Sequence, residues 1–249
     1  MLTNKIVKYI QSLSHKKFRD EEGAFIAEGP KVLSEFLLSK KFECIMICAE
    51  KDWLLNSSSL LYTISSEKIY AIDDQWLKRI SCLKTPNQVL AVFKQENTFE
   101  EPILQKKISL MLDDIQDPGN LGTIIRNADW FGVENIICSQ NCVDSYNPKV
   151  VQSTMGSLSR VNILYTDLAA FIQKNKITVY AAALSGTSLY ETDNINEGII
   201  LIGNESKGIH ADILKLAAQR ITIPRFGHAE SLNAAVATGI ILSHVKKMR

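Results

Sequence analysis

The sequence predicts an α/β protein with two domains. Short apolar runs with the length and composition of buried strands alternate with segments of helical periodicity along the chain. A polar segment at 95–107, which contains Pro102 and lacks clear periodicity, interrupts this alternation. A chain of 249 residues is long enough for two such units. We therefore expect a small α/β domain at 1–96, a linker at 97–106 and a second domain at 107–249.

The composition is that of an ordinary globular protein, with 46% hydrophobic and 22% charged residues. The first residues lack the apolar run of a signal peptide, and no apolar run is long enough to span a membrane, so we expect a cytoplasmic protein that has no contact with membranes. The net charge of +1 is spread evenly, which excludes a uniformly basic nucleic-acid binder but allows a local basic patch. The five cysteines form no CxxC pair, which predicts free thiols and no metal site.

The first domain contains a small alternating set of elements but no catalytic constellation. We expect helices at 4–13, 31–38 and 65–80 and strands at 24–27, 44–48, 60–64 and 88–93. A basic cluster follows the opening helix, and its Lys16, Lys17 and Arg19 are candidates for contact with a phosphate backbone. Short basic clusters are also common on solvated surfaces, so the pattern leaves both interpretations open.

In the second domain, a strand at 108–112 runs directly into a glycine-containing turn and a helix at 123–131. Such a turn suggests ligand binding at the carboxyl end of the strand. The turn matches neither GxxxxGK[ST] nor GxGxxG, so it is not one of the common phosphate-binding fingerprints. Arg126 lies within the helix, where an arginine is normally a surface residue.

Two further loops also follow expected strands. The strand at 199–202 is followed by the sequence GNESKG, whose two glycines imply a tight turn. The strand at 221–223 is followed by a polar loop, and a helical pattern begins at Ser231, which can cap it. Ser231 and Asn233 would then lie at a helix N-terminus, which favours anionic or polar ligand atoms. Taken singly, each pattern also fits a plain turn or a capped buried helix. The other expected elements are strands at 135–138, 161–164 and 178–182, helices at 149–158, 168–174 and 211–218, and a loop at 185–198.

Together the three loops resemble the ordered motifs of the SPOUT class of RNA methyltransferases, specifically its SpoU (TrmH-like) branch of ribose 2′-O-methyltransferases. The first motif is similar to NLGTIIRNA, which begins at Asn120, and the second to GNESKG, which begins at Gly203. The third is similar to the Ile-Pro pair at Ile223 together with SLN, which begins at Ser231. The likeness covers 107–249, and three motifs in order are much more specific than one.

Outside these motifs the resemblance is weaker. The sequence FIAEG, which begins at Phe25, is similar to part of the family's small substrate-binding module. The chain departs from the family at Arg225, where relatives often have methionine, and at Ser206, where glycine is common.

The resemblance implies a parallel sheet in which the C-terminal segment threads through a loop to form a trefoil knot, which general topology rules would not predict. It implies S-adenosylmethionine as the cofactor, with Gly203, Ile223 and Leu232 as its principal contacts. It also implies a structured RNA, ribosomal or transfer, as the substrate, a homodimer with the active site near the subunit interface, and no metal.

Methyl transfer to a ribose needs a 2′-oxygen that is aligned with the sulfonium methyl group and relieved of its proton. A guanidinium stays protonated, so the resemblance gives Arg126 the role of stabilising a developing alkoxide or clamping a phosphate. The base is left open between a phosphate and a water. The orienting hydrogen bonds would come from Asn120, Glu205, Ser231 and Asn233.

Two other classes of function compete with this one. An RNA-binding scaffold of the same fold without catalysis is disfavoured because all five polar candidates are present. A dinucleotide oxidoreductase is disfavoured because the GxGxxG fingerprint is missing.

Overall fold

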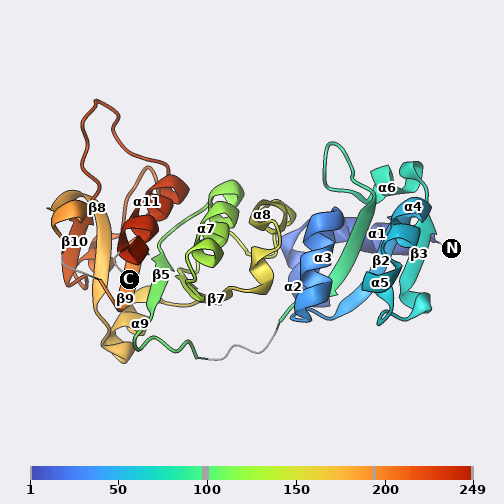
Figure 1. Cartoon of the computed structure of the whole chain (residues 1–249), viewed down its shortest axis with the longest axis horizontal. Helices are drawn as coiled ribbons and strands as arrows, with labels where there is room; N and C mark the ends of the chain where they lie inside the picture. Colours follow the sequence, from blue (N-terminus) through green and yellow to red (C-terminus); the bar gives the residue numbers. More distant parts are fainter. Residues whose placement is uncertain (1, 97–100, 193–194, 248–249) are drawn as a thin grey trace. The chain divides into compact units, whose positions relative to one another are not determined.

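The structure is a computed structural model that describes residues 2–96, 101–192 and 195–247. It divides into two compact units (Figure 1). Unit 1 comprises Met1–Phe99 and Asp144–Ser159, and unit 2 comprises Glu100–Val143 and Arg160–Arg249. The segment Asp144–Ser159 thus packs with the first unit, whereas we had expected it in the second domain. Within the described ranges, no helix is long and apolar enough to cross a membrane.

Unit 1 is built on a four-stranded mixed sheet in the order β1-β4-β2-β3. The central strand β4 runs antiparallel to both β1 and β2, and β3 runs parallel to β2. The strands are β1 (Ala24–Glu28), β2 (Cys44–Glu50), β3 (Ile69–Ile72) and β4 (Val89–Lys94). The helices are α1 (Asn4–Ser12), α2 (Lys16–Glu22), α3 (Pro30–Ser39), α4 (Lys51–Asn56), α5 (Ser58–Leu61), α6 (Asp74–Ile80) and α8 (Pro148–Thr154), with 3₁₀ turns η1 (Ser66–Lys68) and η2 (Ser157–Ser159).

Two expectations for unit 1 were wrong. The segment 60–64, expected to be a strand, contains the end of α5 and a turn. The segment 65–80, expected to be one helix, contains η1, β3 and only then α6. The cause is strand pairing between segments that are separated in the sequence. Ile69 lies opposite Ile47 in the parallel β2–β3 ladder, and this tertiary contact overrides the local helical pattern. Helix α6 begins where the side chain of Asp73 accepts a hydrogen bond from the backbone of Trp76.

A buried ion pair ties the segment Asp144–Ser159 into unit 1. The side chain of Arg19 is 1% exposed, and its Nε and Nη2 donate to Oδ2 of Asp144 at 3.0 and 2.6 Å. Its Nη1 donates to the carbonyl oxygens of Leu13 and Ser14. The guanidinium is thus occupied inside the protein, and the expectation that Arg19 contacts a phosphate backbone was wrong. A local cluster of basic residues does not reveal that one of them has a partner 125 residues away.

Aromatic packing reinforces this attachment. The ring of Tyr146 lies 4.6 Å from that of Phe25 and also packs against Phe42. Burial raises the pKa of Tyr146 to about 12, so its hydroxyl stays protonated. That hydroxyl accepts a hydrogen bond from the backbone of Glu96.

Unit 2 is built on a six-stranded sheet in the order β10-β8-β9-β5-β6-β7, in which all neighbouring strands are parallel. The expected α/β fold with a parallel sheet is therefore confirmed. The strands are β5 (Ile108–Leu112), β6 (Asn135–Cys138), β7 (Asn162–Tyr165), β8 (Val179–Ser188), β9 (Gly198–Ile202) and β10 (Gln219–Thr222). The helices are α7 (Pro118–Trp130), α9 (Leu168–Asn175), α10 (Ala211–Leu214) and α11 (Ala234–Lys247), with a 3₁₀ turn η3 (Leu189–Glu191).

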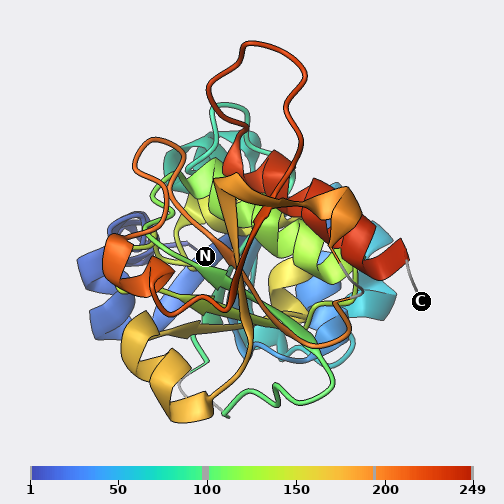
Figure 2. The ribbon, with the colours of Figure 1, turned by 90° about the vertical axis from the view of Figure 1, so that its left-hand side faces the viewer.

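Helices cover both faces of this sheet. Helices α7 and α11 pack side by side on one face, and α9 lies on the other (Figure 2). On the α9 face, Phe171 and Ile172 join a buried cluster with Met111 and Leu201 of the central strands. Because β5 and β9 are buried along their whole length, their sequences are almost entirely apolar, which is why their positions were predicted well.

The boundaries in unit 2 differ from expectation in several places. Strand β8 continues into the segment expected as a loop, helices α7 and α11 begin at Pro118 and Ala234, and helix α10, expected to reach 218, ends at Leu214. Strand β10 pairs with β8 in two stretches separated by a register shift. Gly186 permits this, because a Cβ there would lie 2.5 Å from the carbonyl oxygen of Arg220.

The order of the strands marks where a ligand should bind. The chain passes from β5 to β6 and β7 on one side, whereas β8, β9 and β10 lie on the other side. In a parallel sheet, ligands bind outside the carboxyl ends of the strands at such a reversal. The carboxyl ends of β5 and β9 are therefore the edge on which the candidate residues must be sought.

The buried ion pair of unit 1 gives a test of stability. Replacing Arg19 by alanine leaves the carboxylate of Asp144, only 13% exposed, without its cation. We expect the free energy of unfolding to fall by about 3 kcal/mol in urea denaturation. Lys16→Ala, which breaks only the exposed pair with Asp20, is the matched control and should change it by less than about 0.5 kcal/mol. Equal effects of the two variants would contradict the structural role of Arg19.

Candidate active site

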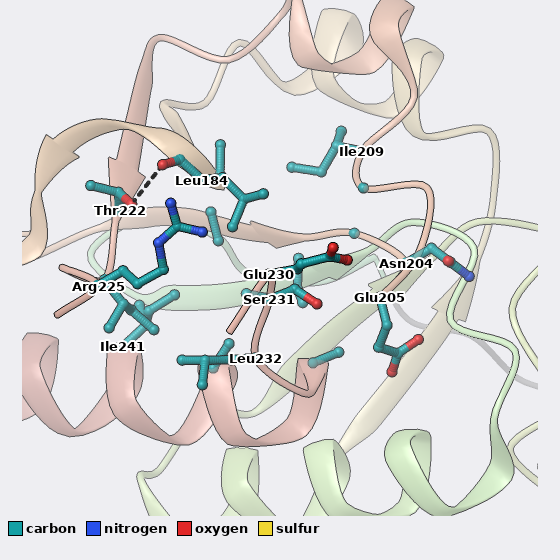
Figure 3. A pocket seen from close by; sticks show the side chains of 18 of the residues that line it. Leu184, Asn204, Glu205, Ile209, Thr222, Arg225, Glu230, Ser231, Leu232 and Ile241 are labelled. Atoms are coloured by element: carbon teal, nitrogen blue, oxygen red, sulfur yellow. Dashed lines mark hydrogen bonds between the residues drawn. The ribbon is translucent and has the colours of Figure 1, made fainter. Parts of the chain in front are cut away.

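A pocket of about 640 Å³ lies beside β8 and at the carboxyl ends of β9 and β10 (Figure 3). Its walls come from β8, from the turn after β9, from the loop 223–233 and from the first turns of α11. Most of its lining is apolar. The large apolar side chains are Leu184, Ile202, Ile209, Leu214, Ile221, Ile223, Phe226, Leu232 and Ile241. This volume and lining are typical of a pocket for a small-molecule ligand or cofactor.

Three polar side chains from three loops form one hydrogen-bonded chain at this edge of the sheet. Asn120, in the first turn of α7, donates from Nδ2 to Oε1 of Glu205, which lines the pocket in the turn after β9. The same amide accepts at Oδ1 from Nδ2 of Asn233, at 2.8 Å. These partners are 85 and 113 residues away along the chain. The structure thus brings together three of the expected residues, one from each motif.

Helix caps hold two members of this chain in place. Asp117 caps α7 by accepting from the backbone of Asn120, at 2.8 Å, which explains why the helix begins earlier than expected. Oδ1 of Asn233 accepts from the backbone of Ala235, at 3.0 Å, and from that of Val236. Asn233 therefore caps α11, and the expectation that Ser231 caps it was wrong. Ser231 lies three residues before the helix and lines the pocket instead.

The turn after β9 requires close contact between backbone segments. Asn204 and Gly208 exchange backbone hydrogen bonds of 3.1 and 2.9 Å across the turn. A Cβ at Gly203 would lie 2.5 Å from the carbonyl carbon of Gly208. Gly208 itself has a φ of +70°, which favours glycine. The two glycines are thus explained by the turn that presents Glu205.

Two buried acids that were not predicted anchor this turn. Asp113 and Asp114 follow β5 directly, and both are almost completely buried. Asp113 accepts from the backbone and the ring of His210, which raises the pKa of the imidazole above its ordinary value. Asp114 accepts from Nζ of Lys207 at 3.3 Å, and its carbonyl oxygen accepts from Nδ2 of Asn204. The sequence does contain a signal that could have identified these residues, namely two adjacent acids directly after an apolar strand. Buried carboxylates need partners, so such a pair indicates a hydrogen-bonded site.

Arg126 stands apart from the hydrogen-bonded chain. Its side chain is exposed on α7, and it makes no hydrogen bond or ion pair with any residue that the structure describes. Six residues along an α-helix correspond to a rotation that leaves Arg126 about 120° away from Asn120 around the axis. Asn127, its neighbour, instead faces α11 and donates to the carbonyl oxygen of Ala235 at 2.8 Å.

The remaining candidates divide between the two units. Gly203, Ile223 and Leu232, expected as cofactor contacts, all line the pocket. Lys16 and Lys17 lie on α2 of unit 1 with exposed side chains, paired with acids one turn further along the same helix.

The turn after β9 yields a matched pair of variants. Gly203→Ala places a methyl group against backbone that cannot move without breaking the turn, so we expect a loss of about 2 kcal/mol of stability in urea denaturation. Gly227→Ala, in the other loop that lines the pocket, adds a methyl group with no neighbouring atom within 4 Å. It should leave stability nearly unchanged. A Gly203→Ala protein as stable as Gly227→Ala would mean that the close contact is not needed.

Comparison with known families gives two regions, of which the second includes the segment Asp144–Ser159 that packs with unit 1. Residues 107–243 match the SpoU rRNA Methylase family, and residues 4–91 match the MRM3-like substrate binding domain. The first match covers the strands and loops that form the pocket.

Individual relatives extend the likeness to the whole chain. The 23S rRNA (guanosine(2553)-2′-O)-methyltransferase of Bacillus subtilis is 29% identical over 250 residues, which cover 98% of this chain and 96% of that protein. A solved structure of a TrmH-family protein from Porphyromonas gingivalis has 34% identity and a TM-score of 0.86, and the match covers 100% of both chains. An AdoMet-bound rRNA methyltransferase from Sinorhizobium meliloti has 30% identity and a TM-score of 0.87, and covers 100% of this chain and 96% of that one. This chain belongs to the SpoU family of RNA methyltransferases.

Proposed function

We propose that this protein transfers a methyl group from S-adenosylmethionine to a ribose 2′-hydroxyl of ribosomal RNA. The observation that carries the proposal is the hydrogen-bonded chain from Glu205 through Asn120 to Asn233, beside a pocket of cofactor size. The named relatives support the substrate, since the Bacillus subtilis protein methylates a ribose 2′-oxygen in 23S rRNA.

The pocket fits S-adenosylmethionine, the cofactor of this family. Its apolar walls suit an adenine, with Ile223 and Leu232 supplying side chains and Gly203 allowing close approach to the backbone. The cofactor, when bound, supplies an electrophilic methyl group on its sulfonium. Methyl transfer needs no metal.

The side chains of Glu205, Asn120 and Asn233 position other groups and take no part in bond formation. Asn120 uses both ends of its amide within the protein, so it orients Glu205 and Asn233. Glu205 and Ser231 line the pocket, where their oxygens can accept from or donate to a ribose. Because all three loops are fixed by helix caps and buried acids, the ribose would meet groups that are already oriented.

Arg126 is assigned to stabilise negative charge that develops on the ribose oxygen, or to clamp a phosphate. Its exposure fits a homodimer in which α7 lies near the partner's site. The same helix exposes Trp130, 83% accessible, and α11 exposes Val236, 52% accessible. Apolar side chains of this size on neighbouring helices are typical of a surface that a second copy covers. The trefoil knot that the family resemblance implies stays a prediction.

Unit 1 is assigned to RNA affinity and not to chemistry. Its match to a substrate binding domain supports this role. The exposed Lys16 and Lys17 remain candidates for phosphate contact, whereas Arg19 is removed from that set because it is buried.

The substrate is tested by mapping 2′-O-methyl groups in ribosomal and transfer RNA from a strain that lacks the gene. We expect one ribosomal mark to disappear and to return when the wild-type chain is supplied. Asn120→Ala should not restore it, whereas Asn175→Ala, at the far end of α9, should. Unchanged marks in both RNA classes would overturn the proposal, and loss of a transfer-RNA mark would overturn the choice of ribosomal RNA.

The role of Arg126 is tested by single-turnover methyl transfer. Arg126→Ala should lower the rate by roughly a hundredfold, as loss of an oxyanion donor does. Arg126→Lys keeps the charge but loses the planar fork, so its rate should stay low if geometry matters. Cofactor affinity serves as the control and should be preserved in both variants. A surface residue would instead leave the rate almost intact, and that outcome would show that the catalytic assignment is wrong.

A further inference from the structure

Two of the four charged residues that line the pocket carry opposite charges and are not paired with each other. Arg225 and Glu230 both belong to the loop between β10 and α11, and both line the pocket. Their side chains extend into it, with the guanidinium on the side of Leu184 and the carboxylate on the side of Asn204 (Figure 3). Among the described residues, neither forms an ion pair, and Arg225 makes one long hydrogen bond of 3.3 Å from Nη1 to the carbonyl oxygen of Ala229.

We propose that Arg225 and Glu230 bind the amino-acid part of S-adenosylmethionine, Arg225 its carboxylate and Glu230 its ammonium. The inference rests on the proposed use of that cofactor. A guanidinium presents two parallel N–H donors that match the two oxygens of a carboxylate, and four of the five N–H groups of Arg225 are not engaged in a hydrogen bond within the described chain. A carboxylate such as Glu230 is the natural acceptor for an ammonium. The two charges together match a zwitterion.

The same pair argues against an RNA phosphate as the ligand of Arg225. A phosphate would satisfy the guanidinium, but it would be a third negative group in a pocket that already contains Glu230 and Glu205, and it would leave Glu230 without a cation. The other cation of the lining, Lys207, is already paired with Asp114. A ligand that carries both charges satisfies Arg225 and Glu230 at once.

A neutral side chain of similar length at this position, such as methionine, could not donate hydrogen bonds to a carboxylate. Affinity for the amino-acid end of the cofactor should depend on Arg225 in this chain.

The test compares two ligands by calorimetry with the full-length protein. S-adenosylhomocysteine carries the amino-acid part, and 5′-methylthioadenosine keeps the adenosine and sulfur but lacks it. Arg225→Met should weaken S-adenosylhomocysteine binding at least tenfold and change 5′-methylthioadenosine binding less than about threefold. The control is Arg220→Met, which removes the same charge from an exposed position on β10 outside the pocket. It should affect neither ligand.

A second pair of variants separates the two charges. Decarboxylated S-adenosylmethionine lacks the carboxylate but keeps the ammonium, so its affinity should fall with Glu230→Gln and be insensitive to Arg225→Met. Glu191→Gln, at an exposed acid outside the pocket, is the matched control for Glu230→Gln.

The outcomes are distinct. Equal weakening of S-adenosylhomocysteine and 5′-methylthioadenosine by Arg225→Met would assign Arg225 to the adenosine end, and no weakening of either would make it a surface residue. Both results overturn the proposal. Retained 5′-methylthioadenosine binding shows that the variant pocket is folded. Binding of S-adenosylhomocysteine by the wild-type protein tests the proposed function. The difference between the two ligands in the affinity lost on Arg225→Met tests the assignment of Arg225. Neither measurement contains RNA.

Discussion

The amide of Asn120 is the point on which the arrangement of the site depends. One side-chain amide donates to Glu205 and accepts from Asn233, so three loops are held together through a single group. An amide can do this because it carries a donor and an acceptor at a fixed separation, whereas an aspartate in its place could only accept. The parallel sheet makes the meeting possible, since it brings the carboxyl ends of β5, β9 and β10 to one edge. The chemistry of the pocket thus depends on the strand order.

A second layer of buried groups keeps these loops in place. Asp113 and Asp114 lie at the end of β5 but bind the turn after β9, through His210, Lys207 and Asn204. Buried carboxylates without partners would be costly, so the turn is held in a conformation that satisfies them. Glu205 is therefore presented by a segment whose position is fixed from outside the pocket. Such support reduces the reorganisation that a reaction would otherwise require.

The sequence predicted the unit 2 strands and the three loops because local patterns determine them. Apolar runs such as β5 and β9 are buried on both faces, and glycines mark the turn that follows. The failures in unit 1 have a common physical cause, which is contact between residues far apart in the chain, whereas the helix starts in unit 2 were missed because local caps were not recognised. β3 exists because β2 lies beside it, and Arg19 is buried because Asp144 is its partner. The roles of Asn120 and Asn233 came only with the family resemblance, since no periodic pattern distinguishes a structural amide from a catalytic one.

The position of Arg126 divides the site into two parts. The cofactor pocket and the amide chain are complete within unit 2, but the guanidinium assigned to stabilise charge lies on a different side of α7 from Asn120. A long, exposed side chain can reach a substrate that docks across the helix, and it can equally reach a site on a second copy. In the first arrangement the guanidinium meets the ribose only when the RNA is docked, and in the second it is supplied by the partner subunit. Methyl transfer would then depend on how the RNA or the second copy docks, because the amide chain and the cation lie on different sides of α7.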